Sequence, residues 1–179
     1  ISPNGDLIRD VNQYFSKQWF DIEGVARLFY KNEYLGTIIR RIIDGRLYST
    51  IWKGKTKSDY TEFKISKNIH LGFHSLTNDS WKMNFLDTSH KNEQEINIHT
   101  ISHTWNGSTI THGKELKSSA TYEGWENLQL TAGKFECQRF LWKTPSNKLL
   151  KIWRMGEARV LAKMEVVVGK NKGAISELS

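Results

Sequence analysis

The stretch YEGWENLQL-TAGK-FECQRFLW-KTPSN-KLLKIWRM-GE-ARVLAKMEVVV, residues 122–168, decides the fold. Its four runs of apolar and aromatic residues are separated by short segments that contain Ala-Gly, Thr-Pro-Ser-Asn or Gly. Gly, Pro and Asn mark turns, and turns this short join strands that lie next to each other. The stretch therefore predicts four successive antiparallel strands.

The same alternation with period two continues towards the N-terminus as far as Gly24. Asp44-Gly45 and Asn106-Gly107 are strong signals for tight hairpins. About ten to twelve short strands with hairpin-length connections predict an all-β fold, an antiparallel meander that forms a closed or partly open barrel. The predicted strands cover residues 25–30, 34–44, 46–52, 60–66, 70–76, 81–86, 95–105, 108–114, 118–130, 135–142, 148–155 and 158–168.

Residues 1–23 form the one segment with helical spacing, because Leu7, Val11, Tyr14 and Phe15 recur on one side of a helix. We expect one short N-terminal helix there and a polar tail over residues 169–179. No repeat and no linker is visible, so residues 1–179 are predicted to form a single domain.

Charge and composition exclude two classes of partner. The net charge is +7, but the basic residues are scattered over turns instead of forming one patch, which argues against nucleic-acid binding. No run of 18 apolar residues occurs, so no membrane span is predicted. Cys137 is the single cysteine, which leaves no disulfide framework.

The first residues are Ile-Ser-Pro-Asn-Gly-Asp, without an initial Met. Removal of a signal peptide would explain this start and favours a periplasmic or secreted protein. A truncated chain explains it equally well, and a cytoplasmic location and the oligomeric state both stay open.

The second half of the chain resembles a bacterial envelope family of unknown function that has a barrel-like antiparallel fold. The residues that carry the resemblance are Gly124-Trp-Glu126, Ala132-Gly-Lys-Phe-Glu136, Ile152-Trp153 and Arg159-Val-Leu-Ala-Lys-Met-Glu165, with Tyr34-Leu-Gly36 and Asp44-Gly45 near the start. These motifs imply turns and packing and no catalytic residues. In size and aromatic content the chain is also similar to terpene-epoxide lyases of the alpha-pinene oxide lyase type.

Five of the six histidines lie between His70 and His103. His70 and His74 are four residues apart, as are His99 and His103, which on a strand separates them by about 13 Å, too far to share one ion. We therefore predict no metal. His99 and His103 share a face with Ile101 and Trp105, which suits a partly polar cavity, although solvent-facing histidines fit the same pattern.

Glu123 flanks Trp125 and is the best candidate for an inward-facing acid, because a desolvated carboxyl keeps its proton and can donate it. Arginines within strands are a second signal, since an inward guanidinium needs a carboxylate or an anionic ligand. These arginines are Arg27, Arg40 and Arg139.

No serine elbow, phosphate loop, dinucleotide motif or paired-cysteine metal motif occurs, so no cofactor is predicted. We therefore expect a cofactor-independent lyase or isomerase that acts by acid–base chemistry on a hydrophobic substrate, for example a terpenoid epoxide, inside a barrel cavity. Its predicted catalytic residues are Glu123 as the acid and His99 and His103 as bases or orienters; its predicted substrate-binding residues are Trp105, Trp125, Tyr122 and His74. The alternative is a non-catalytic envelope protein that binds or carries a hydrophobic ligand.

Overall fold

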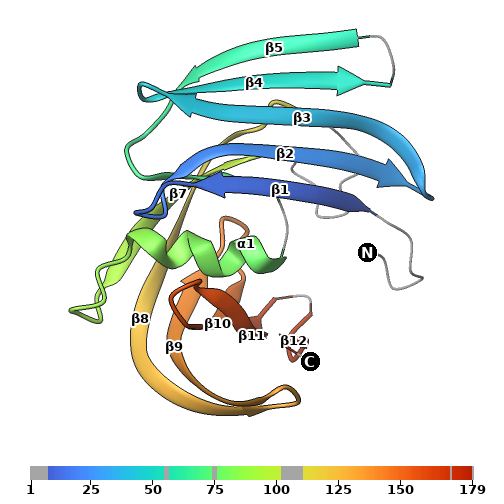
Figure 1. The fold of residues 1–179 in the computed structure, drawn as a ribbon. Coiled ribbons are helices and arrows are strands. Elements are labelled where there is room, and N and C mark those ends of the chain that lie inside the picture. The colour runs from blue at the N-terminus through green and yellow to red at the C-terminus, as the bar shows by residue number, and fades with distance from the viewer. Residues whose placement is uncertain (1–7, 55–56, 74–75, 102–110, 170, 179) are drawn as a thin grey trace. The chain divides into compact units, whose positions relative to one another are not determined.

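The computed structural model describes residues 8–54, 57–73, 76–101, 111–169 and 171–178 (Figure 1). Within these ranges it contains twelve strands, one short α-helix and one 3-10 helix, which confirms the all-β prediction. The chain divides into two compact units, Ile1–Ser75 with Ile98–Glu115 and Leu76–Asn97 with Leu116–Ser179, and each has its own core. The single domain over 1–179 stays a prediction.

The first unit is built on a five-stranded antiparallel sheet whose strands are neighbours in chain order (Figure 1). The predicted Asp44-Gly45 hairpin joins two of them, and both of its residues have the positive φ that such a tight turn requires. The strands are β1 (Arg9–Phe15), β2 (Asp21–Tyr30), β3 (Glu33–Ile43), β4 (Arg46–Lys53) and β5 (Lys57–Lys64).

The inner face of this sheet forms the core of the first unit. Alternate residues of β2, β3 and β4 point to it, and all are fully or almost fully buried. The core residues are Ala26, Leu28, Ile38, Leu47 and Ile51, with Leu71, Phe73 and Ile101. We call the opposite side of the sheet the outer face.

The prediction of an N-terminal helix is wrong, because β1 pairs with β2 over the segment Arg9–Phe15. Its side chains alternate, with Asn12 and Tyr14 exposed and Val11 packed on the core. Val, Asn, Tyr and Phe are mediocre helix formers, so pairing with a neighbouring strand overrides the helical spacing.

The second sheet has seven strands in the order β12-β11-β10-β9-β8-β7-β6. The pairs from β8 to β12 are antiparallel, and β12 lies in the segment predicted as a polar tail. The strands are β6 (Ile69–Gly72), β7 (Glu93–Thr100), β8 (Lys114–Leu130), β9 (Gly133–Lys143), β10 (Leu149–Met155), β11 (Val160–Val168) and β12 (Ile175–Glu177). The predicted Asn106-Gly107 hairpin lies outside the described residues.

The α-helix among the described residues is central, not N-terminal. α1 (Leu76–Trp81) continues into the 3-10 helix η1 (Lys82–Phe85), where a strand over 81–86 was predicted. Lys82 and Met83 are buried, and Lys82 forms an ion pair with Asp79, three residues earlier. A short apolar run does not separate helix from strand by itself, and here helical contacts prevail.

The described strands form no closed barrel. Closure requires the first and last strands of a sheet to pair with each other. In the described part of the chain the first sheet ends at β1 and β5 and the second at β12 and β6. After β5 the chain enters the second sheet instead of returning to β1, so the meander is divided between two sheets.

Candidate functional site

The structure describes four of the seven residues predicted for the site. His99 lies on β7 in the first unit, whereas Tyr122, Glu123 and Trp125 lie on β8 in the second unit. The other three, His74, His103 and Trp105, lie outside the described residues, and their roles stay predictions.

His99 is a buried side chain of the first unit. Only 2% of the residue is exposed, and its ring centroid lies 4.7 Å from that of Phe63. Burial, and after it the positive charge of Arg40, lower the pKa of His99 to about 3. Such an imidazole is neutral at neutral pH and a weak base. The catalytic role of His99 stays a prediction. Its burial fits the predicted role of orienting a neighbouring group better than that of a base that accepts a proton.

Arg40 is the inward arginine that the sequence indicated. Its guanidinium is completely buried, and it donates to the backbone oxygens of His99 (2.8 Å), Thr100 (3.0 Å) and His112. Burial lowers its pKa to about 9. The charge is thus solvated by peptide dipoles, and no ion pair of Arg40 with a carboxylate is formed by the residues that the structure describes.

Close backbone approach makes this arrangement possible. Gly113 has a φ of +75°, and a Cβ built on it would lie 1.5 Å from the Thr100 oxygen and 2.7 Å from Nη2 of Arg40. No side chain fits there. A glycine therefore follows His112 for a steric reason as well as a conformational one.

His112 is a polar residue that the sequence did not single out. Its Nδ1 lies 2.9 Å from Oγ of Ser49, and its Nε2 lies 3.3 Å from Oδ2 of Asp59. Ser49 is completely buried, whereas the Asp59 side chain is 58% exposed. The contact with Ser49 is a hydrogen bond, whereas the contact with Asp59 lacks hydrogen-bond geometry. His112 therefore lies between a surface carboxylate and a buried hydroxyl and is hydrogen-bonded only to the hydroxyl.

A second histidine–carboxylate pair lies on the same unit. Nδ1 of His70 and Oδ2 of Asp21 are 3.1 Å apart, and both side chains are buried. Gln13 donates to the other oxygen of Asp21 and to the backbone oxygen of Leu71, 3.2 Å away. Because these bonds connect β1, β2 and β6, we interpret the pair as a structural tie.

Glu123 lies at a β-bulge in the second unit. The pairing of β8 with β9 passes from Tyr122 to Gly124, so Glu123 has no partner residue on β9. Its carboxylate lies 2.8 Å from Nε of Arg139. Trp125 is 59% exposed, so it forms no dry wall beside the acid. The catalytic role of Glu123 stays a prediction. The neighbour of its carboxylate is the Arg139 guanidinium, where an apolar neighbour, Trp125, was expected.

Glu126 shares Arg139 with Glu123. It accepts hydrogen bonds from Nη1 of Arg139 (2.8 Å) and from Nε1 of Trp153 (2.9 Å). The hydrogen bond from Trp153 first, and then the Arg139 guanidinium, lower the pKa of Glu126.

Tyr122 packs in the core, because the residue is 7% exposed and its ring centroid lies 5.3 Å from that of Phe140. Its predicted contact with a substrate stays a prediction.

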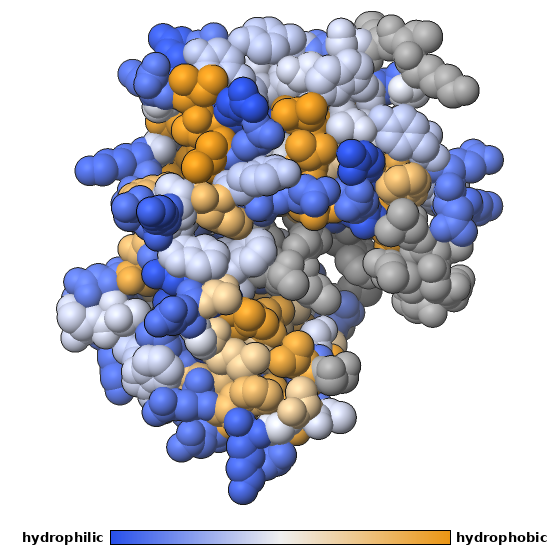
Figure 2. Space-filling model, in the orientation of Figure 1, coloured by the Kyte–Doolittle hydropathy of each residue, from blue (hydrophilic) through white to orange (hydrophobic). Residues whose placement is uncertain are grey.

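The outer face of the first sheet carries three aromatic side chains, of which Trp52 and Tyr60 are exposed and Tyr48 is half-buried. Tyr48, Trp52 and Tyr60 point away from the core, because their strand neighbours Leu47, Ser49 and Ile51 are the buried ones. Trp52 is 37% and Tyr60 58% exposed, and the Tyr48 and Tyr60 rings are 6.4 Å apart. We call these three residues the aromatic strip. In Figure 2 hydrophobic and near-neutral side chains gather over these strands among isolated hydrophilic ones.

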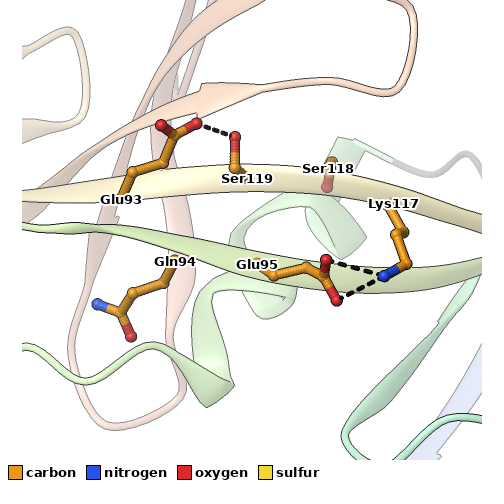
Figure 3. Close-up of a pocket in the computed structure, with 6 residues that line it drawn as sticks. All are labelled: Glu93, Gln94, Glu95, Lys117, Ser118 and Ser119. Carbon is orange, nitrogen blue, oxygen red and sulfur yellow. Dashed lines mark hydrogen bonds and ion pairs between the residues drawn. The ribbon is translucent and has the colours of Figure 1, made fainter.

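A shallow depression on β7 and β8 is polar throughout. In Figure 3 the carboxylate of Glu95 faces Lys117, 3.0 Å away, and Glu93 faces Ser119. Both side chains of the Lys117–Glu95 pair are more than half exposed. Because Lys117 is paired with Glu95 and Glu93 is hydrogen-bonded to Ser119, we assign no site there.

The described residues contain no group of three or more His, Cys, Asp or Glu side chains placed to hold a metal ion. Within the same residues, no helix has the length and apolar character needed to cross a bilayer.

Comparison with protein-family models, with curated proteins and with solved structures finds no match to this chain.

Proposed function

We propose that this protein binds a neutral, flat and largely apolar ligand on the aromatic strip and does not transform it. The exposure of the strip is the observation that carries the proposal. Large aromatic side chains are normally buried, and a group of them at the surface is typical of a binding surface.

The geometry of the strip supports a flat ligand. Trp52 and Tyr48 are four residues apart on β4, hence separated by about 13 Å along the strand. Tyr60 pairs with Thr50, the residue midway between them, on the neighbouring strand. The three residues therefore form a triangle on the outer face, with Tyr60 on β5 beside the space between Tyr48 and Trp52, and a planar molecule lying over this triangle can contact each ring.

The charges around the strip support a neutral ligand. Each arginine in this part of the outer face has a carboxylate partner: Arg27 pairs with Asp10, Arg41 with Glu23, and Arg46 with Glu62. A nucleic-acid surface would instead present uncompensated cations beside its stacking rings. The guanidinium charges on this part of the outer face are thus compensated within the protein.

The expected contribution of each ring follows from its area. If a ligand covers about half of a tyrosine ring, about 80–100 Å² leaves water, which is worth about 2 kcal/mol. Removing one ring should therefore weaken binding by about 10–30-fold.

The test is a fluorescence titration of the full chain with N-phenyl-1-naphthylamine, an uncharged aromatic probe. Tyr60→Ala should raise the Kd about tenfold. Tyr14→Ala is the matched control, because Tyr14 is also 58% exposed on the outer face but lies on β1, three strands from β4. Equal Kd values for both variants, or no saturable binding, would refute the proposal. If the titration supports the proposal, mass spectrometry of a solvent extract of the purified protein would identify a natural ligand.

Acid–base catalysis on a hydrophobic substrate is the second candidate. The observation that favours it is His112, half-buried between Ser49 and Asp59. We would incubate the chain with alpha-pinene oxide and measure the products by gas chromatography. Turnover by the wild type that His112→Asn abolishes would support this function, whereas turnover retained by the variant would remove His112 from it.

A further inference from the structure

One row of residues crosses the whole outer face of the first sheet. Its members are direct partners on neighbouring strands, so their side chains lie side by side at intervals of about 4.8 Å. We call it the central row, and from β1 to β5 it consists of Asn12, Val25, Ile39, Thr50 and Tyr60. The row begins at the aromatic strip, to which Tyr60 belongs, and leads away from it across β4, β3 and β2.

The middle of the central row is apolar and partly open to solvent. Val25 and Ile39 are both half-buried. Their neighbours along the strands, Ala26 and Ile38, are completely buried in the core on the other face of the sheet. Thr50, between Ile39 and the strip, is also half-buried and adds a methyl group and a hydroxyl. A partly exposed apolar path therefore runs from Thr50 to Val25 over two strand spacings, about 10 Å.

Polar rows border the central row on both sides. On one side Glu23 and Arg41 lie opposite each other and form an ion pair. On the other side Asp10 and Arg27 do the same. All four residues are two positions from the central row along their strands, hence about 7 Å away. An apolar chain that left the central row would remove water from these charges, which is unfavourable, so the ion pairs confine it to the row.

We propose that the ligand of the aromatic strip is a flat, uncharged ring that carries one unbranched hydrocarbon chain, and that this chain lies along the central row. The inference rests on the proposed function, because the strip binds the ring. The chain covers Ile39 and Val25 and ends at Asn12, whose exposed amide lies about 14 Å from Thr50. It takes apolar surface out of water on both the ligand and the protein.

The length of the chain sets the size of the effect. A methylene group that leaves water completely strengthens binding about fourfold, so one that is half covered on an open face contributes about twofold. Hexyl 4-hydroxybenzoate is longer than methyl 4-hydroxybenzoate by five methylene groups and should therefore bind about 30-fold more tightly.

The test is equilibrium dialysis of the full chain against the methyl and hexyl esters at pH 7, with the bound ester measured by absorbance. Ile39→Thr should remove most of the advantage of the hexyl ester and leave the Kd of the methyl ester within twofold. Val25→Thr should reduce the same advantage, because threonine has nearly the shape of valine but carries a hydroxyl. Threonine is a good strand former, so both variants should fold.

Ile43→Thr is the matched control. Ile43 lies on the same strand as Ile39, is 44% exposed on the same face, and is four residues away, about 13 Å. This variant should keep the ratio of the two Kd values that the wild type shows.

The outcomes distinguish this inference from the proposed function. If the methyl ester shows no saturable binding, the strip is not a ligand site and both fail. If the methyl ester binds and the hexyl ester binds no more tightly, the chain has no site and this inference alone is overturned. The same holds if Ile39→Thr keeps the ratio as Ile43→Thr does, because Val25 and Ile39 then serve only to form strands.

Discussion

Acid should destabilise this protein through His99. The unfolded chain binds a proton on this imidazole near pH 6.5, whereas the folded chain does so only near pH 3. Between these values the unfolded state holds more protons, so the free energy of unfolding falls as the pH falls. Above about pH 6.5 both states are neutral and His99 contributes nothing to the pH dependence.

The size of the effect follows from the pKa difference. One pKa unit corresponds to 1.36 kcal/mol, so lowering the pH from 7 to 5 should remove about 2 kcal/mol of stability through His99. That is a substantial share of the 5–15 kcal/mol typical of a folded domain.

The assay is urea unfolding at pH 7 and pH 5, followed by tryptophan fluorescence, for the wild type and His99→Gln. Carboxylates also lose their ion pairs in this range, but they do so in both proteins, and the difference isolates His99. We expect the variant to lose about 2 kcal/mol less than the wild type over this interval.

An equal loss of stability in the wild type and in His99→Gln would refute the reasoning. It would mean that the folded protein accommodates the His99 imidazolium despite its burial and the nearby Arg40 charge.

Other substitutions test the remaining contacts. Arg40→Met should lower the free energy of unfolding by about 3–5 kcal/mol in urea titrations, because it leaves three buried carbonyl oxygens without donors. A loss below about 1 kcal/mol would show that these three hydrogen bonds do not stabilise the fold. Gly113→Ala should cost about 3 kcal/mol or more, since its Cβ collides with the backbone of Thr100, and a variant as stable as the wild type would show that the two segments are not in contact. Glu126→Gln should destabilise by about 1 kcal/mol at pH 7 through weaker bonds to Arg139 and Trp153. Because the Glu126 pKa is lowered in the folded state, its contribution should disappear as the pH falls below that of a free glutamate, and a pH-independent difference would argue against it.

Local patterns predicted the strands and failed where tertiary contacts decide. Period-two alternation and the Asp44-Gly45 turn suffice for β3 and β4, because hairpin partners are adjacent in sequence. The segment Arg9–Phe15 satisfies both periods, and only its pairing with β2 selects the strand. Closure of a barrel depends on which distant strands meet, which alternation does not specify.

The candidate site was harder to predict than the fold for a related reason. Glu123 and Trp125 share a face only in a regular strand, and the bulge at Gly124 breaks this rule. The arginine signal was sound for Arg139, whose partners are Glu123 and Glu126, but Arg40 is satisfied by peptide oxygens, which no sequence pattern reveals. The aromatic strip was not predicted, because alternation along residues 46–52 does not tell which of its two faces is buried.

One guanidinium, that of Arg40, hydrogen-bonds to the backbone oxygens of both Thr100 and His112. The same side chain therefore connects the end of β7 to the residues that lead into β8. Two strands that follow each other in the chain thus depend for their junction on a residue of β3, far away in the sequence.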